Sequence, residues 1–136
     1  MIKFAVIGTN WITQKFVQAA HESQSMQLAA VYSRNLDSAV QFAQEFDVET
    51  TYDSLDALAN DKTVEAVYIA SPNSLHCEQS IFMMENGKHV ICEKPVASNI
   101  DEATRMFEVA QQNGVVLFFF HNGGPTGFPT GRCHSR

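Results

Sequence analysis

The chain has 136 residues, of which 45% are hydrophobic and 18% are charged, and its formal net charge is −6 at pH 7. This length and composition predict one ordinary globular domain with a core of its own. The acidic balance gives no electrostatic reason to expect nucleic acid or an anionic membrane as a partner, so any anion-binding site must be local.

Apolar runs rich in β-branched residues alternate along the chain with segments of helical spacing. We interpret these runs as strands, because continuous hydrophobicity is typical of parallel strands that are covered on both faces. The predicted strands span residues 2–7, 26–32, 64–70, 89–92 and 115–119, with a weaker short strand at 50–52.

Helical spacing fills the segments between these strands. Apolar residues recur every three or four positions over 36–43 and again over 100–110. Gly87 and Gly114 each follow a helical pattern and predict helix ends, and Asp53 is a predicted N-cap. Strand–helix–strand units in succession predict an α/β fold with a doubly wound parallel sheet. Ligands of such sheets bind beyond the carboxyl ends of the strands.

The cysteines and the apolar runs predict a cytoplasmic protein. Cys77, Cys92 and Cys133 form no paired spacing and no cluster with histidines, so we expect reduced thiols and no metal site. The start, "MIKFAVIG", is too short for a signal peptide, and the longest apolar run, 115–120, is far too short to cross a membrane.

The stretch "AVIGTNWIT", residues 5–13, lies where the first strand turns into a helix. Gly8 fills the first glycine position of a dinucleotide-binding turn, whereas Asn10 and Thr13 occupy the second and third. Asparagine tolerates left-handed backbone, so the turn is retained although a diphosphate would meet a more crowded surface. The stretch predicts a phosphate-binding turn, with a plain tight turn as the alternative. Its candidate cofactor-binding residues are Gly8, Thr9, Asn10, Trp11 and Ile12.

The stretch "VYSRN", 31–35, ends the second strand with Ser33 and Arg34. A site for NAD usually carries an acidic residue here, which accepts bonds from the ribose hydroxyls. An arginine can instead stack on adenine and bind a 2′-phosphate with its planar guanidinium group. We therefore expect NADP rather than NAD, with NAD and a merely solvated arginine as the alternatives.

The stretch "ASPNSLH", 70–76, follows the fourth strand. Pro72 restricts Ser71 to extended conformations, and Asn73 or Ser74 then caps the next helix. Amides at that cap would face a cofactor crevice, and Asn73 is a candidate contact on the nicotinamide side. His76 either faces a substrate or lies on the surface.

The stretch "CEKP", 92–95, follows the fifth strand and pairs Glu93 with Lys94 ahead of Pro95. Proline fixes the backbone there and could aim the lysine in one direction. A lysine near a positively charged nicotinamide ring would have a lowered pKa, which makes proton transfer near neutral pH feasible. An exposed Glu–Lys loop remains an equal alternative.

Together these segments resemble the glucose–fructose oxidoreductase and inositol dehydrogenase family (Gfo/Idh/MocA). The resemblance spans about residues 1–118 and is most specific in "PNSLH" after "VYIA" and in "EKP" after "GKHVIC". It implies an N-terminal Rossmann domain that binds NAD(P), and hydride exchange with a carbohydrate-like alcohol or carbonyl. It also implies that Lys94 assists the proton transfer, that Glu93 touches the nicotinamide ribose, that Asn73 and Pro72 line the same wall, and that Arg34 contacts the adenosine end.

Members of this family continue into a second domain that supplies the substrate pocket. Here residues 119–136 are rich in glycine and proline and predict an irregular tail after a nucleotide-binding domain over 1–118. We therefore expect the nucleotide-binding half of an oxidoreductase, without the family's association through the second domain. The alternatives are a dinucleotide-binding module without catalysis and a truncated, non-functional remnant.

Overall fold

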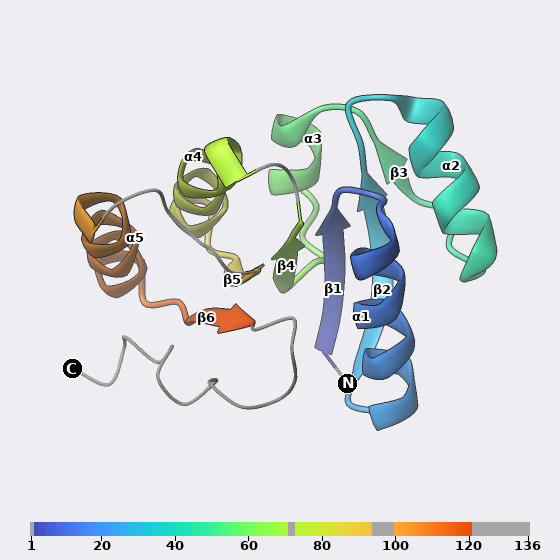
Figure 1. Cartoon of the computed structure of the whole chain (residues 1–136), viewed down its shortest axis with the longest axis horizontal. Helices are drawn as coiled ribbons and strands as arrows, with labels where there is room; N and C mark the ends of the chain where they lie inside the picture. Colours follow the sequence, from blue (N-terminus) through green and yellow to red (C-terminus); the bar gives the residue numbers. More distant parts are fainter. Residues whose placement is uncertain (1, 71–72, 94–99, 121–136) are drawn as a thin grey trace.

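Six parallel strands form one sheet in the order β3-β2-β1-β4-β5-β6 (Figure 1). The computed structural model describes residues 2–70, 73–93 and 100–120. The strands are β1 (Ile2–Ile7), β2 (Met26–Tyr32), β3 (Thr51–Tyr52), β4 (Ala66–Ile69), β5 (His89–Glu93) and β6 (Leu117–Phe120). The helices are α1 (Trp11–Ser23), α2 (Leu36–Glu45), α3 (Leu55–Ala59), α4 (Asn73–Glu85) and α5 (Ile100–Asn113). The strand order reverses between β1 and β4, so the predicted doubly wound parallel sheet is confirmed.

Two predicted strands begin later than their apolar runs. Val64 lies in a turn, in which its N–H donates to the carbonyl of Asp61, and β4 starts at Ala66. The N–H of Val115 donates to the carbonyl of Ala110, so this residue closes the end of α5 rather than opening β6. The hydrophobic runs were therefore longer than the strands, because buried apolar residues also anchor the turns that precede them.

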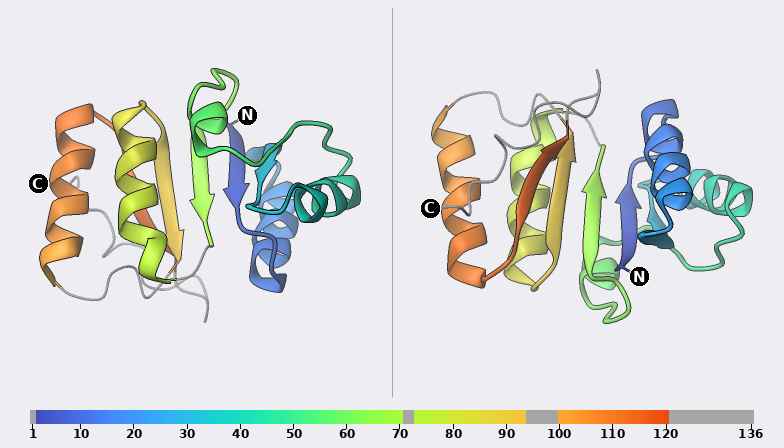
Figure 2. Two further views of the ribbon diagram at one scale, coloured as in Figure 1. Left: turned by 90° about the horizontal axis from the view of Figure 1, so that it is seen from above. Right: turned by 90° about the horizontal axis from the view of Figure 1, so that it is seen from below.

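The two faces of the sheet carry separate cores. Side chains alternate along a strand, so Phe4 and Val6 of β1 pack with α1 and α2, whereas Ala5 and Ile7 pack with α3, α4 and α5. Figure 2 shows α4 and α5 at the β5–β6 end of the sheet and α1 and α2 at the β2–β3 end. Covering on both faces explains why β1, β2 and β4 have continuous hydrophobicity.

The amphipathic stripe predicted for α2 is shifted toward the end of the helix. Leu36, predicted to be in the stripe, is 44% exposed, whereas Phe42 is only 4% exposed in the core. Leu36 is the first helical residue, and it lies beyond the carboxyl end of β2, where the sheet offers no surface to cover it. The predicted cap at Asp53 is also wrong by one residue, since the Ser54 hydroxyl accepts the bond from the N–H of Ala57.

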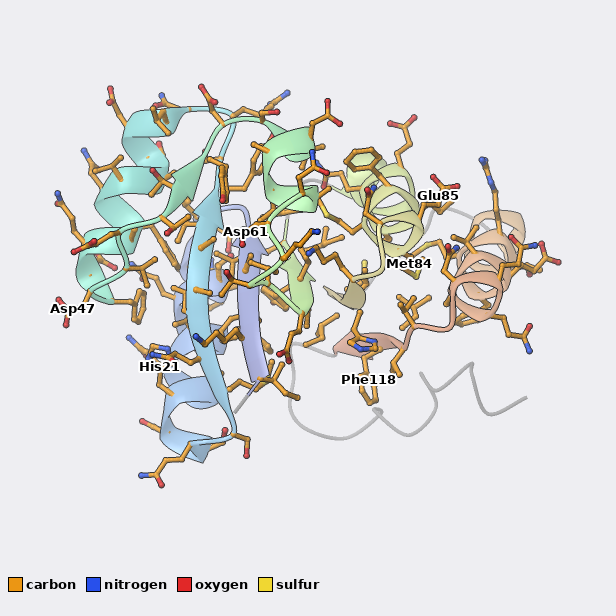
Figure 3. The ribbon with its side chains drawn as sticks, turned by 180° about the vertical axis from the view of Figure 1, so that it is seen from behind. His21, Asp47, Asp61, Met84, Glu85 and Phe118 are labelled. Carbon is orange, nitrogen blue, oxygen red and sulfur yellow. The ribbon has the colours of Figure 1, made fainter. Side chains whose placement is uncertain are left out.

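At the β6 edge an apolar side chain points away from the helices. Phe118 projects from β6 on the side opposite α4 and α5 (Figure 3) and is 39% exposed. Ile91 of β5 is its neighbour in the parallel register and is half-buried. No helix in the described part of the chain is both long and apolar enough to span a bilayer.

A buried lysine joins the loop before β5 to the loop before β4. Lys88 is 6% exposed, and its ammonium donates to the carbonyls of Asp61, at 2.6 Å, and Val64, at 2.9 Å. The carboxylate of Asp61 accepts from the Tyr52 hydroxyl, at 2.7 Å, and from the N–H of Thr63, at 2.9 Å (Figure 3 labels Asp61). These bonds fix the segment that leads from α3 into β4.

The network changes the pKa of each titratable member. Burial lowers the pKa of Lys88, although the nearby Asp61 carboxylate opposes this. Burial acts to raise the pKa of Asp61, but hydrogen bonds from Tyr52 and Thr63 and the charge of Lys88 outweigh it, and the net pKa is lowered. The hydrogen bond to Asp61, with burial and the carboxylate charge, raises the pKa of Tyr52 to about 12.

We expect Lys88→Ala to lower the free energy of unfolding by about 2 kcal/mol, because it leaves the buried carbonyl of Val64 without its donor and removes one of the two donors to the carbonyl of Asp61. Lys62→Ala is the matched control, since Lys62 lies exposed in the same loop and its loss should change stability by less than about 0.5 kcal/mol. Urea unfolding followed by circular dichroism measures both. Equal losses for the two variants would contradict the role of Lys88.

We expect the hydrogen bond from Tyr52 to Asp61 to stabilise the fold at neutral pH and to lose this effect at high pH. The folded pKa of about 12 lies above the ordinary 10.0, so the contribution is complete below pH 10 and is lost as pH rises to 12. Tyr52→Phe should therefore be less stable than wild type at pH 8, and the gap should close between pH 10 and 12. Denaturant unfolding of both proteins across that range measures the gap, and a constant gap would refute the assignment.

Candidate functional site

A cleft of about 410 Å³ opens at the carboxyl ends of β1, β2 and β4. It lies at the reversal of strand order, where ligands of doubly wound sheets bind. Its walls come from the turns after β1 and β2, from the residue after β4 and from α4. The lining residues are Ile7, Gly8, Thr9, Asn10, Tyr32, Ser33, Arg34, Asn35, Ala70 and Gln79. Five of the predicted cofactor-binding residues therefore lie together: Gly8, Thr9, Asn10, Ser33 and Arg34.

The turn after β1 depends on a glycine at its first position. Gly8 has a φ of 110°, a conformation that residues with a Cβ rarely adopt. Its N–H donates to the carbonyl of Tyr32 at 3.1 Å, which ties the turn to the end of β2. Asn10, in contrast, has a φ of −84° and a ψ of −179°. The expectation that Asn10 serves by tolerating left-handed backbone is therefore wrong.

Asn10 instead connects three parts of the site through its side chain. Its Oδ1 accepts from the N–H of Thr13 at 3.0 Å, as an N-cap of α1, and from the hydroxyl of Thr13 at 3.1 Å. Its Nδ2 donates to the carbonyl of Ala70, the residue after β4, at 3.2 Å. Thr13 is completely buried. The two residues that interrupt the glycine pattern thus form a polar contact of their own, which joins α1 to the end of β4.

The turn after β2 is held by hydrogen bonds on both sides of Arg34. The N–H of Ser33 donates to the carbonyl of Tyr52 at 3.1 Å, and the Ser33 hydroxyl accepts from the N–H of Asn35 at 3.2 Å. The Oδ1 of Asn35 caps α2 by accepting from two amides of its first turn. Arg34 is exposed and lines the cleft. The turn therefore presents the arginine at the mouth of the cleft on a fixed backbone.

The residues that line the cleft carry positive charge, although the protein as a whole is acidic. Among the lining residues that the structure describes there is one arginine and no carboxylate, whereas the whole chain has a net charge of −6. The first turn of α1 has no acidic residue, although those of α2 and α3 each have one. The amino end of a helix carries a partial positive charge, so both features favour an anionic ligand.

Two predicted residues lie next to the cleft without lining it. Trp11, the first residue of α1, is 59% exposed, and the ammonium of Lys15 lies 5.4 Å from its ring centroid. Ile12 is half-buried in the same turn. Their assignment to the cofactor stays a prediction.

The remaining predicted residues fall at the ends of β4 and β5. Ile69 pairs with Cys92 in the parallel register, so the segments that follow these two strands leave the sheet side by side. The structure places the backbone of Asn73, His76 and Glu93, in the first turn of α4 and at the end of β5. Four other predicted residues lie outside the described residues, and their roles stay predictions: Ser71, Pro72, Lys94 and Pro95.

The structure adds lining residues that the sequence analysis missed. Tyr32 and Ala70 stand at strand ends, and Asn35 has the ordinary signal of an N-cap ahead of an amphipathic stretch. Gln79 lies within α4, and no motif marks it. The described ranges contain no group of three or more His, Cys, Asp or Glu side chains that could hold a metal ion.

Comparison with protein families identifies the chain. The family described as "Oxidoreductase family, NAD-binding Rossmann fold" (Gfo/Idh/MocA) matches residues 2–121. The chain belongs to this family. The resemblance predicted from the motifs is thereby confirmed, and the cleft lies where a Rossmann fold binds its dinucleotide.

Curated relatives of the Gfo/Idh/MocA chain include two bacterial proteins. An uncharacterized oxidoreductase, YgjR of Escherichia coli, is 54% identical over 118 residues, covering 87% of this chain and 36% of the relative. A scyllo-inositol 2-dehydrogenase (NADP(+)), IolU of Bacillus subtilis, is 49% identical over 117 residues, covering 86% of this chain and 36% of the relative. The chain thus spans about a third of the length of these relatives and corresponds to the nucleotide-binding half of the family.

A solved structure supports the same correspondence. The 3-ketoreductase of Actinomadura kijaniata, determined with NADP and TDP-benzene, superposes with a TM-score of 0.80 at 32% identity, covering 87% of this chain and 36% of that one. The Rossmann sheet is therefore the shared part.

We expect Asn10→Ala to lower the free energy of unfolding by about 1–2 kcal/mol, because it removes the N-cap of α1 and the bond to Ala70. Asn10→Ser is the matched control: serine keeps an acceptor for the cap but is too short to donate across to β4, so it should recover about half of the loss. Thermal unfolding followed by circular dichroism compares the three proteins. An alanine variant as stable as wild type would contradict the role of Asn10.

Proposed function

We propose that this chain is the NADP-binding half of an oxidoreductase that exchanges a hydride with a carbohydrate-like alcohol or carbonyl. The observation that carries the proposal is the convergence of the Gly8 turn and the Ser33–Arg34 turn on one cleft, whose lining among the described residues has no carboxylate. An acidic side chain at the end of β2 would suit the 2′-hydroxyl of NAD and repel the 2′-phosphate of NADP. Arginine and serine at that place suit the phosphate.

The residues of the cleft fit the parts of such a cofactor. The turn over Gly8, Thr9 and Asn10 and the amino end of α1 would hold the diphosphate, with Trp11 and Ile12 in the same helical turn. Arg34 and Ser33 would hold the 2′-phosphate at the adenosine end. The opposite, nicotinamide end then falls beyond β4 and β5.

The family resemblance supports the roles of the segments after β4 and β5. When bound, the nicotinamide ring supplies the hydride acceptor or donor. Lys94 would move the proton of the substrate hydroxyl, Glu93 would hold the nicotinamide ribose, and Pro95 would fix the direction of the lysine. The wall facing them would consist of Ser71, Pro72, Asn73 and His76. The register that brings the ends of β4 and β5 side by side is consistent with this grouping.

The substrate class comes from the relatives. One is named a scyllo-inositol 2-dehydrogenase and another, a solved structure, is a 3-ketoreductase with a bound TDP derivative. We propose that residues 1–118 form the nucleotide-binding domain and 119–136 a tail. The remaining length of the relatives would supply the substrate pocket, because the chain spans only 36% of them.

We expect Arg34→Ala to weaken NADPH binding by about 10–100-fold and NADH binding by less than about threefold, because only NADPH carries the phosphate that the guanidinium binds. The chain has a single tryptophan, Trp11, beside the cleft, so energy transfer from it to the bound dihydronicotinamide reports binding. Arg105→Ala is the matched control, since Arg105 lies exposed on α5. Equal weakening of both cofactors by Arg34→Ala would refute the 2′-phosphate assignment.

We expect the chain by itself to bind NADPH but to turn over scyllo-inositol with NADP at least about a hundredfold more slowly than the roughly 10 s⁻¹ of ordinary enzymes. The reason is that one wall of the substrate pocket would be missing, and orientation contributes most of the rate. Absorbance at 340 nm measures the turnover. If the chain turned over scyllo-inositol at the ordinary rate and Lys94→Ala abolished that turnover, the chain would need no further domain.

A further inference from the structure

Two helix ends in this chain carry the same Asn–Gly pair. Helix α4 is followed by Asn86 and Gly87, and α5 ends at Asn113 with Gly114 after it. The sequence has a third such pair at 122–123, outside the described residues. Asparagine loses its side-chain amide most readily before glycine, because glycine has no side chain to hinder the attack of its own nitrogen on the asparagine.

The reaction at such a pair takes place within the chain, with water as the only co-reactant. The amide nitrogen of Gly87 loses its proton and attacks Cγ of Asn86, a C–N bond forms, and Nδ2 leaves as ammonia. Water then opens the cyclic imide, and no atom is oxidised or reduced. Opening at Cγ gives aspartate, whereas opening at the main-chain carbonyl carbon gives isoaspartate, which lengthens the backbone by a methylene group.

The folded end of α4 keeps both reacting groups occupied. The Nδ2 of Asn86 donates to the carbonyl of Phe82 at 2.8 Å, which directs the side chain back along the helix. The N–H of Gly87 donates to the carbonyl of Met84 at 3.0 Å (Figure 3 labels Met84), and Gly87 has a φ of 84°, as in a Schellman cap. The attacking nitrogen therefore holds its proton in a hydrogen bond, and the side chain that it would attack is directed away.

Lys88 fixes the residue that follows the pair. Its N–H donates to the carbonyl of Met83 at 3.0 Å, and its buried ammonium donates to the carbonyls of Asp61 and Val64. The peptide of Gly87 has to rotate before its nitrogen can meet the asparagine side chain, and this rotation pulls on Lys88. Because Lys88 is anchored by its main chain and its side chain, it opposes the local opening of the cap.

The end of α5 has the same cap with a different anchor. The Nδ2 of Asn113 again donates to the carbonyl four residues earlier, at 2.9 Å, and the N–H of Gly114 donates to the carbonyl of Gln111 at 3.3 Å. The residue in the place of Lys88 is Val115, which is 6% exposed and belongs to the apolar core. A buried ammonium therefore holds the cap of α4, and apolar packing holds that of α5.

We propose that Asn86 is a site of spontaneous deamidation that the buried ammonium of Lys88 holds closed in the folded protein. The inference is independent of the proposed binding of NADP. The product cannot restore the cap, because aspartate has no N–H to donate to Phe82 and its charge lies at the negative end of the helix. Deamidation therefore leaves a looser connection between α4 and β5.

Peptide mapping by mass spectrometry measures the loss of amide at Asn86 and Asn113 in the same sample. In mildly alkaline buffer, folded wild type should react at each site about thirtyfold more slowly than in concentrated urea, because two hydrogen bonds of each cap must break first. Equal rates with and without urea would overturn the proposal, and so would the absence of reaction at Asn86 in urea.

Lys88→Met keeps the length of the side chain and removes the ammonium. It should speed the reaction of folded protein at Asn86 about tenfold and leave Asn113 unchanged, because it loosens only the cap of α4. Tyr52→Phe is the matched control, since it also removes a hydrogen bond to Asp61 but leaves both bonds of the Lys88 ammonium in place. It should keep the ratio of the two rates found in wild type.

Lys88→Gln provides a second variant in case the methionine variant fails to fold. Its amide can still donate to one of the two carbonyls, so the increase should be smaller and again confined to Asn86. An equal increase at Asn113 would show that unfolding of the whole chain carries the reaction, which contradicts the role of Lys88. An unchanged rate at Asn86 in the folded variants contradicts it as well.

Discussion

The site depends on hydrogen bonds that hold the carboxyl ends of three parallel strands in one place. The N–H of Gly8 bonds to the end of β2, the N–H of Ala70 bonds to the carbonyl of Ile7, and the amide of Asn10 bonds to the carbonyl of Ala70. The first two bonds each join the residue that leaves one strand to the neighbouring strand, and the third joins the N-cap of α1 to the residue after β4. At a switch of strand order, the connections that follow the two central strands turn to opposite sides of the sheet. The cleft between them keeps its shape only if the ends of these strands are held in place.

Charge and packing then decide what the cleft can hold. The chain is acidic overall, yet the described lining has an arginine and no carboxylate, and the first turn of α1 has no acidic residue. The two cores on opposite faces of the sheet give the cleft two different sides. One side presents the amino end of α1, which favours an anionic group, and the other presents the apolar side chains of Ile7 and Tyr32.

The comparison with the family relates this nucleotide-binding half to longer proteins. The relatives are about three times as long as the matched segment, and the strands at the β5–β6 end keep apolar surface such as Phe118 in contact with solvent. The nucleotide-binding half carries two cores and a cleft within the described residues.

The sequence by itself determined the fold and the strand ends that carry the candidate cofactor-binding residues. Continuous apolar runs separated by helical spacing specify a parallel sheet, and the motifs after them placed Gly8 and Arg34 at one edge, because parallel strands share their carboxyl edge. Only the tertiary structure decided how the polar residues are used. Asn10 was predicted to tolerate left-handed backbone at a glycine position, but its backbone is extended and its side chain bonds to the residue after β4. Leu36 fitted a helical stripe yet lies exposed. Gln79 had no signal at all, since it lines the cleft together with residues about seventy positions earlier in the chain, and local patterns do not encode such a grouping.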